Sequence, residues 1–219
     1  MTEKTCVIFG AGHYDGAPVP KDADLYIAAD GGLDAMLRLG VAPDLLIGDL
    51  DSAKNAPPAG LPLLRLPTHK DITDTDAAVR EAQNRGCTRF LMYGLLGGRP
   101  DHSFANVTLL ARLSQEGCKA ALFGAGYVLT ALTDGALTFD AACRGYLSVF
   151  SFSDKSEGVT LNNLAYTMEN GTMTNTFGLG VSNEFTGKAA GVSVKKGTLL
   201  LMYQRTEGIS VYTAAFGSR

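Results

Sequence analysis

The chain has 219 residues, which is enough for one large domain or two modest ones with a sizeable core. Its 46% hydrophobic and 19% charged content is typical of a soluble globular protein. The net charge is −3 and no basic block occurs, which argues against nucleic-acid binding, and no apolar stretch approaches the roughly 20 residues needed to cross a bilayer.

The first 130 residues alternate apolar runs with helical patterns. The apolar runs are continuous, as in strands buried on both faces of a parallel sheet, and the expected strands are 6–10, 25–30, 45–49, 61–67, 89–94 and 119–124. Helices are expected over 32–40, 73–86 and 101–117. The second of these starts at a capping threonine and places Asp76–Arg80 and Glu81–Arg85 at ion-pair spacing. This alternation predicts a three-layer, Rossmann-like α/β domain with a mostly parallel sheet.

The sequence changes character after about residue 130. Helical periodicity disappears, Gly, Thr, Ser and Asn become frequent, and short strand patterns follow one another. The segments "ENGT" (169–172) and "KKGT" (195–198) indicate hairpin turns. We therefore predict an α/β domain over residues 1–130 and an antiparallel β-sandwich or barrel over residues 131–219.

Aspartates follow the predicted strands at the points where those strands end. They are Asp30, Asp49, Asp51, Asp71, Asp74 and Asp101. In an open α/β sheet the carboxyl ends of the strands border the ligand crevice, so these carboxylates are expected to share one rim. A divalent cation such as Mg²⁺ would relieve their mutual repulsion. A structural alternative exists for Asp71, Asp74 and Asp101, because acids are favoured at helix N-termini.

Glycine-rich loops accompany these aspartates. In "GLLGGRPDH" (94–102), Gly97 and Gly98 let backbone amides approach a phosphate, and Arg99 can bind it with two donors. Lys70 is a further candidate for phosphate contact. The segment "GAGHYDG" (10–16) fails the dinucleotide fingerprint because Asp15 stands at the third glycine position, and we expect it to line the same rim.

Six segments together resemble one known family. "ADGG", "PDLLIGDLDS", "HKDITDTD" and "GLLGGRPDH", followed by "GVTLNNLAY" and "GLGVSNEFTG", are similar to the thiamine pyrophosphokinase family from about Cys6 to Tyr203. The resemblance implies an α/β catalytic domain, a C-terminal β-sandwich and a homodimer. It also implies the reaction of ATP with thiamine to give AMP and thiamine diphosphate, with Mg²⁺.

The resemblance also assigns roles to individual residues. Catalytic roles fall on Asp49, Asp51, Asp71, Asp74 and Asp101. The expected metal ligands among them are Asp49, Asp51 and Asp101, while Asp71 or Asp74 is the expected acceptor of the thiamine hydroxyl proton. The resemblance places Asp30, Gly31 and Gly32 at the nucleotide site, and the loop chemistry adds Lys70, Gly97, Gly98 and Arg99 as expected nucleotide contacts. Ser182 and Asn183 are expected to hold the thiamine pyrimidine. Because the chain has no Trp, any ring that stacks on thiamine must be another side chain, and Phe185 and Tyr166 are candidates, with ordinary core packing as the alternative for both.

Two other functions stay open from the sequence. The Asp49-x-Asp51 pattern also resembles the metal site of nucleotide-sugar glycosyltransferases, and the same fold could serve a non-catalytic nucleotide or thiamine sensor. The four cysteines are too far apart for a zinc knuckle or a dense disulfide framework, and the charged N-terminus does not resemble a signal peptide. We therefore expect a cytoplasmic protein.

Overall fold

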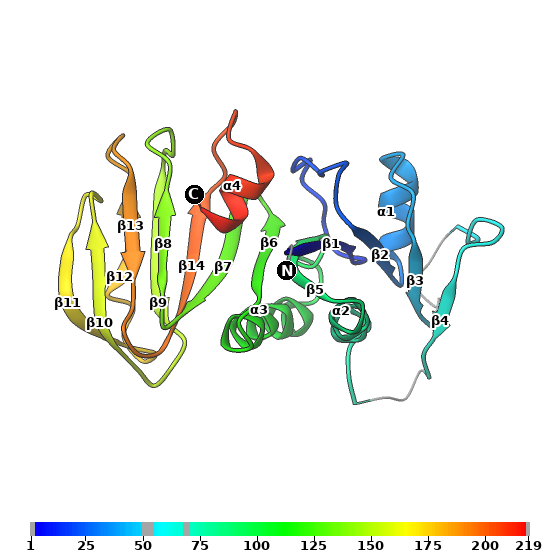
Figure 1. Ribbon diagram of the computed structural model, residues 1–219, viewed down its shortest axis with the longest axis horizontal. Coiled ribbons are helices and arrows are strands. Elements are labelled where there is room, and N and C mark those ends of the chain that lie inside the picture. Colours follow the sequence, from blue (N-terminus) through cyan, green and yellow to red (C-terminus); the bar gives the residue numbers. More distant parts are fainter. Residues whose placement is uncertain (1–2, 50–54, 68–70, 218–219) are drawn as a thin grey trace. The chain divides into compact units, whose positions relative to one another are not determined.

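The structure is a computed structural model that describes residues 3–49, 55–67 and 71–217 (Figure 1). The chain divides into two compact units, a first unit of Met1–Leu109 with Leu122–Ala125 and a second unit of Leu110–Ala121 with Gly126–Arg219. Among the described helices, none has both the length and the apolar character required to cross a membrane.

The elements of the first half of the chain are β1 (Lys4–Phe9), β2 (Leu25–Ala29), α1 (Gly32–Arg38), β3 (Leu45–Gly48), β4 (Leu63–Arg65), α2 (Asp74–Asn84), β5 (Cys87–Tyr93), α3 (Pro100–Gln115) and β6 (Lys119–Gly124). The second half contains β7 (Tyr127–Thr133), β8 (Ala136–Phe139), β9 (Tyr146–Ser151), β10 (Lys155–Asn162), β11 (Met168–Thr174), β12 (Gly180–Glu184), β13 (Ala190–Ser193), β14 (Thr198–Gln204) and α4 (Val211–Phe216).

The sheet of the first unit has the strand order β6-β5-β1-β2-β3-β4. The pairs β1–β5, β1–β2, β2–β3 and β3–β4 are parallel. Helix α1 covers one face of this sheet and α2 with α3 covers the other, as right-handed crossovers require when the strand order reverses (Figure 1). The predicted three-layer α/β fold with a mostly parallel sheet is confirmed.

The apolar strands form the core of this unit because both faces of the sheet are covered. Ile8, Ile27 and Leu91, from three neighbouring strands, have no exposed surface. Helix α1 adds Leu33 and Met36 to the same core. Helix α2 begins at the predicted cap, where Oγ1 of Thr73 accepts a hydrogen bond from the amide of Asp76 at 3.1 Å.

The second unit contains four antiparallel strands of a ten-stranded sheet, in the order β12-β9-β14-β7, and a separate four-stranded antiparallel sheet, in the order β11-β10-β13-β8. The rings of Phe139 on β8 and Tyr203 on β14 meet edge to face at 5.0 Å between the sheets, so the predicted β-sandwich is confirmed. The hairpin prediction for "ENGT" is wrong. Residues 169–172 lie inside β11, where the pairing with β10 shifts register and Asn170 has a φ of 48°. The "KKGT" turn joins β13 to β14, which belong to different sheets, so it does not close a hairpin.

The cap of α2 gives a stability prediction. Thr73→Ala removes the acceptor for the Asp76 amide and is expected to lower the free energy of unfolding by about 1 kcal/mol. Thr73→Ser keeps an oxygen at the same place and is expected to retain most of that stability in urea denaturation. Equal losses in the two variants would contradict the capping role.

Candidate active site

The two glycine-rich loops of the first unit run side by side at the carboxyl ends of β1 and β5. The amide of Gly12 donates to the carbonyl of Gly94 at 2.6 Å, and the amide of His13 donates to the carbonyl of Leu96 at 3.1 Å. The expectation that "GAGHYDG" and "GLLGGRPDH" line one rim therefore agrees with the backbone pairing. Gly97 and Gly98 follow in the exposed part of the second loop.

The strand that ends in "ADGG" turns abruptly into α1. A side chain at Gly32 would collide with the carbonyl of Phe9, so only glycine lets the helix begin this close to β1. Gly31 is the N-cap of the same helix. Gly32 thus serves a packing role at the rim, whatever ligand it contacts.

Asp30 is a buried carboxylate in an unusual backbone conformation. It has a φ of 48°, is 8% exposed, and its amide donates to the carbonyl of Ile47 at 2.7 Å. Within the described residues its Oδ1 is buried and meets no hydrogen-bond donor. A buried carboxylate oxygen is unfavourable unless a cation or a donor satisfies it, so the local structure is suited to a ligand that supplies one.

Asp49 follows Gly48 at the end of the neighbouring strand β3 and is half-buried. Gly48 has a φ of 148°, and a side chain there would lie 3.1 Å from Cβ of Asp30. The paired ends of β2 and β3 therefore carry the two carboxylates on adjacent strands. Asp51 and Lys70 lie outside the described residues.

The predicted acids of "HKDITDTD" take different positions around the start of α2. Asp71 is exposed before the helix, and Asp74 is its half-buried first residue. Asp76 forms an ion pair with Arg80 at 2.8 Å, one turn along the helix. Asp76, which follows the two predicted acids, is therefore paired with a side chain of its own helix.

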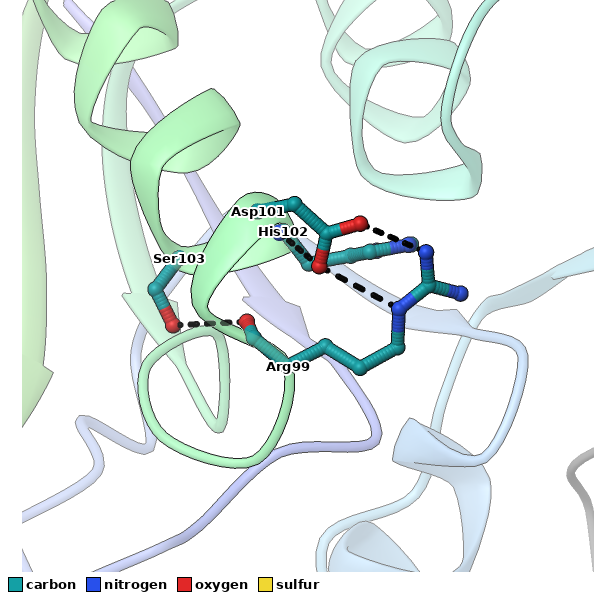
Figure 2. Close-up of polar contacts among 4 residues, drawn as sticks. All are labelled: Arg99, Asp101, His102 and Ser103. Carbon is teal, nitrogen blue, oxygen red and sulfur yellow. Dashed lines mark hydrogen bonds and ion pairs between the residues drawn. The ribbon is translucent and has the colours of Figure 1, made fainter.

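Arg99 and Asp101 form a two-donor ion pair at the start of α3 (Figure 2). Nη2 of Arg99 lies 2.6 Å from Oδ2 of Asp101 and Nε lies 3.2 Å from Oδ1, while Oδ1 also accepts from the His102 amide at 3.0 Å. Both side chains are more than 60% exposed. The predicted phosphate ligand and the predicted metal ligand therefore neutralise each other in this structure.

The ion pair changes the titration of both groups. The hydrogen bonds from Arg99 lower the pKa of Asp101 from its ordinary 3.8 to about 2, with a smaller contribution from the His102 amide. The same contact raises the pKa of Arg99. A lowered pKa means that the folded state favours the charged carboxylate, and this preference is lost only as the pH falls through about 2.

No complete metal cluster is formed by the part of the chain that the structure describes. Within residues 3–49, 55–67 and 71–217, no three His, Cys, Asp or Glu side chains lie close enough to hold a metal ion together. Since Mg²⁺ commonly uses one or two carboxylates plus substrate oxygens and water, the pair of acids at the ends of β2 and β3 still suits that ion. The assignment of Asp49, Asp51 and Asp101 as metal ligands stays a prediction.

The predicted thiamine residues lie on β12 in the second unit. Ser182 is exposed and has a φ of 58° at a register shift between β12 and β9. Asn183 is only 2% exposed, and its amide group bonds to the backbone of Tyr166. Phe185 is buried against Phe139 at a ring distance of 5.3 Å, which leaves Tyr166 as the exposed ring of the two candidates. No sequence pattern pointed to the contact between Asn183 and Tyr166.

These features define a class of protein: an α/β enzyme with a nucleotide-type rim at the carboxyl ends of its parallel strands, joined to a β-sandwich. Two family models match the chain. Residues 18–122 match "Thiamin pyrophosphokinase, catalytic domain" and residues 137–199 match "Thiamin pyrophosphokinase, vitamin B1 binding domain". The chain belongs to the thiamin pyrophosphokinase family.

Individual proteins support this assignment. Thiamine pyrophosphokinase of Bacillus subtilis is 27% identical over 187 residues, covering 81% of this chain and 86% of that protein. Its crystal structure has a TM-score of 0.80 at 26% identity and covers 92% of this chain and 99% of that one. The crystal structure of thiamin pyrophosphokinase from Geobacillus thermodenitrificans has a TM-score of 0.78 at 25% identity, covering 93% and 99% of the two chains.

The ion pair gives a testable titration. In metal-free protein, Arg99→Gln is expected to raise the pKa of Asp101 from about 2 towards its ordinary 3.8, because the variant removes the charged donor. Carboxyl carbon chemical shifts measured against pH report this value. Arg80→Gln, which breaks the separate pair with Asp76, is the matched control and should leave Asp101 unchanged. An Asp101 that still titrates near 2 in Arg99→Gln would show that the pair is not the cause.

Proposed function

We propose that this protein transfers the diphosphoryl group of ATP to the hydroxyl of thiamine, giving AMP and thiamine diphosphate with the help of Mg²⁺. The observation that carries the proposal is the buried Oδ1 of Asp30, which meets no hydrogen-bond donor among the described residues and follows β2, the strand that pairs with β3 before Asp49. Two glycine-rich loops that pair through their backbones follow β1 and β5 of the same sheet. Such a rim suits a ligand that brings both a cation and a polyphosphate. The two matched family domains, a catalytic domain and a vitamin B1 binding domain, suit the two parts of this reaction.

The phosphates of ATP are proposed to bind at the loops of β1 and β5. Gly97 and Gly98 lie in this exposed loop, and Arg99 provides a two-donor guanidinium next to them. The ion pair that holds Arg99 in this structure is exposed and therefore weak. Exchange of Arg99 from Asp101 to a phosphate releases the carboxylate of Asp101 for metal binding.

The proposed metal ligands are Asp49, Asp51 and Asp101, and Asp30 is proposed to line the nucleotide site. When bound, Mg²⁺ neutralises charge on the transferred phosphates. The protein side chains hold the ATP phosphates in line with the incoming hydroxyl, and most of the rate enhancement is expected from this positioning. The surplus of carboxylates leaves one available for proton transfer.

The chemical step breaks the bond between the β-phosphorus of ATP and the oxygen that bridges it to the α-phosphorus. The thiamine hydroxyl oxygen forms the new bond to the β-phosphorus, and AMP leaves with the bridging oxygen. Asp71 or Asp74 accepts the hydroxyl proton. Asp71 is exposed before the helix, whereas Asp74 is the half-buried first residue of α2, so the two acids differ in position and burial.

The remaining parts of the proposal concern the whole protein. We place the thiamine site on the β-sandwich around Ser182 and Asn183, and the domain division near residue 130, which falls within β7. A homodimer is proposed on the family resemblance, and the exposed Leu179 and Val181 at edge strand β12 offer apolar surface for association. The four cysteines are free thiols, which supports a cytoplasmic location.

Turnover separates this function from the alternatives. Incubation with ATP, Mg²⁺ and thiamine is expected to produce AMP and thiamine diphosphate in equal amounts, measured by chromatography. A glycosyltransferase would form neither product under these conditions. Binding of both ligands without AMP formation would instead identify a sensor and would overturn the proposed reaction.

The aspartates of "GDLDS" give a second test. Asp49→Asn and Asp51→Asn are each expected to lower kcat by at least about 100-fold, the scale of losing one electrostatic contact in a transition state. Asp76→Asn is the control, because Asp76 pairs with Arg80 and is assigned no catalytic role. Circular dichroism confirms folding of each variant. Near-normal turnover of either Asp49→Asn or Asp51→Asn would show that its assignment is wrong.

A further inference from the structure

Four consecutive backbone carbonyl groups at the end of β5 each accept a hydrogen bond from another part of the first unit. Three of the donors are amides of the glycine-rich loop after β1, with Gly10 donating to Tyr93 at 2.9 Å, Gly12 to Gly94 at 2.6 Å and His13 to Leu96 at 3.1 Å. The carbonyl of Leu95 accepts instead from a side chain, Nδ2 of Asn106 on α3, at 2.8 Å. Asn106 therefore links this loop to the helix that follows it.

The link between Asn106 and Leu95 is buried. Asn106 is 6% exposed and Leu95 is 7% exposed. The side chain of Leu95 packs so closely on Gly10 that a side chain at Gly10 would collide with Cδ2 of Leu95. Because a buried carbonyl without a donor is unfavourable, the Leu95 backbone is expected to shift when the amide of Asn106 is removed.

The other end of the loop is fixed by the first turn of α3. The carbonyl of Arg99 accepts hydrogen bonds from the amide of Ser103 at 3.1 Å and from its Oγ at 3.2 Å (Figure 2). Residues 97–98 connect this anchor to the hydrogen-bonded carbonyls at the end of β5. Because Asn106 belongs to the same helix as the anchor, its hydrogen bond to Leu95 sets how far apart the two ends of the glycine segment lie.

Gly97 and Gly98 do not fix the shape of their own segment. Their φ angles are 81° and 69°, in the region that glycine enters freely, and successive glycines have many other conformations of similar energy. Apart from its chain neighbours, no described residue lies within 4 Å of the point where a side chain at Gly98 would begin, so packing does not hold it either. The conformation of this segment therefore depends on its two anchors, and Asn106 joins them.

We propose that Asn106 is a positioning residue for ATP, whose amide holds the 97–99 segment in the conformation that receives the phosphates. This inference rests on the proposed function, which places the ATP phosphates at this loop. Phosphate oxygens need several donors at fixed positions, and a loop that is already held in place binds them without an added cost of ordering. Asn106 contacts no substrate in this role and acts through the segment that carries Arg99.

Asn106→Leu tests this role with a side chain of similar size that has no hydrogen-bond donor. The KM for ATP is expected to rise about tenfold, because the loop loses the link between its anchors, while the KM for thiamine stays within about twofold of the wild type. A KM for ATP within twofold of the wild type would overturn the proposal. Equal increases in both KM values would also overturn it, because they would indicate general damage to the fold.

Thr130→Val is the matched control. Oγ1 of Thr130 also donates from a buried side chain to a backbone carbonyl, that of Ala120 at 2.7 Å, but this hydrogen bond lies in the second unit. The control is expected to leave both KM values within about twofold of the wild type, and an equal rise in the KM for ATP would overturn the assignment to Asn106. If Asn106→Leu fails to fold, Asn106→Ser takes its place, because its shorter side chain gives up the Leu95 carbonyl and its hydroxyl can bond within α3.

A double-mutant cycle with Arg99→Gln tests whether Asn106 acts through the loop. Arg99 lies in the segment that Asn106 is proposed to hold. Asn106→Leu is therefore expected to weaken ATP binding less than about threefold in the Arg99→Gln background, compared with about tenfold on its own. Fully multiplied effects would show that Asn106 acts independently of Arg99 and would overturn the proposal.

Calorimetric titration with ATP and with AMP, in Mg²⁺ and without thiamine, separates this inference from the reaction. In Asn106→Leu, the affinity for ATP is expected to fall about tenfold and that for AMP less than about twofold, because AMP lacks the outer phosphates. An equal loss for AMP would overturn the positioning role. The expected losses in a protein that forms no thiamine diphosphate would support the positioning role and reject the proposed reaction. Normal turnover with an unchanged ATP affinity in Asn106→Leu would reject only the positioning role, and a wild-type protein that neither binds nor converts ATP would reject both.

Discussion

The close approach of α1 to the carbonyl end of β1 is the constraint on which the rim of the first unit depends. Because Gly32 has no side chain, the helix can begin directly beside Phe9, and the chain must turn sharply immediately before it. Asp30 lies in that turn, with its backbone fixed to β3 and one carboxylate oxygen buried without a partner in the described residues. A tight backbone packing requirement and an unsatisfied acidic group are thus consequences of the same four-residue segment.

The two units fix their candidate functional side chains in opposite ways. The pair of Arg99 and Asp101 is exposed, so each member can exchange its partner for solvent or a ligand at low cost. The buried amide of Asn183 makes two hydrogen bonds with the backbone of Tyr166 and accepts a third from the amide of Glu184, so these contacts are expected to persist when a ligand binds. The exchangeable contact suits the proposed movement of Arg99 to a phosphate, whereas the hydrogen bonds of Asn183 fix the backbone of Tyr166.

Much of the fold could be predicted because its signals are local. Continuous apolar runs identified the parallel strands, and the cap at Thr73 with the ion pairs at Arg80 and Arg85 identified α2. The bulge in β11 could not be predicted, since "ENGT" also suits a turn and only the pairing with β10 decides between them. The positions of the aspartates after apolar runs predicted that they lie at strand ends. The sequence did not predict that Asp101 forms an ion pair with Arg99. The hydrogen bond between Asn183 and Tyr166 joins residues 17 positions apart, and no periodic pattern in the sequence indicates it.

The pairing of Arg99 with Asp101 has a consequence for the salt dependence of ATP binding. In the proposed reaction, the guanidinium exchanges one anionic partner for another, so one ion pair is lost as a second is formed. Dissolved salt screens both exposed pairs, and its effects on them partly cancel. If Arg99 had no partner within the protein, dissolved salt would weaken its ion pair with ATP without any compensating change. In the proposed function, the carboxylate of Asp101 would therefore make the contribution of Arg99 to nucleotide affinity less sensitive to the ionic strength of the surroundings.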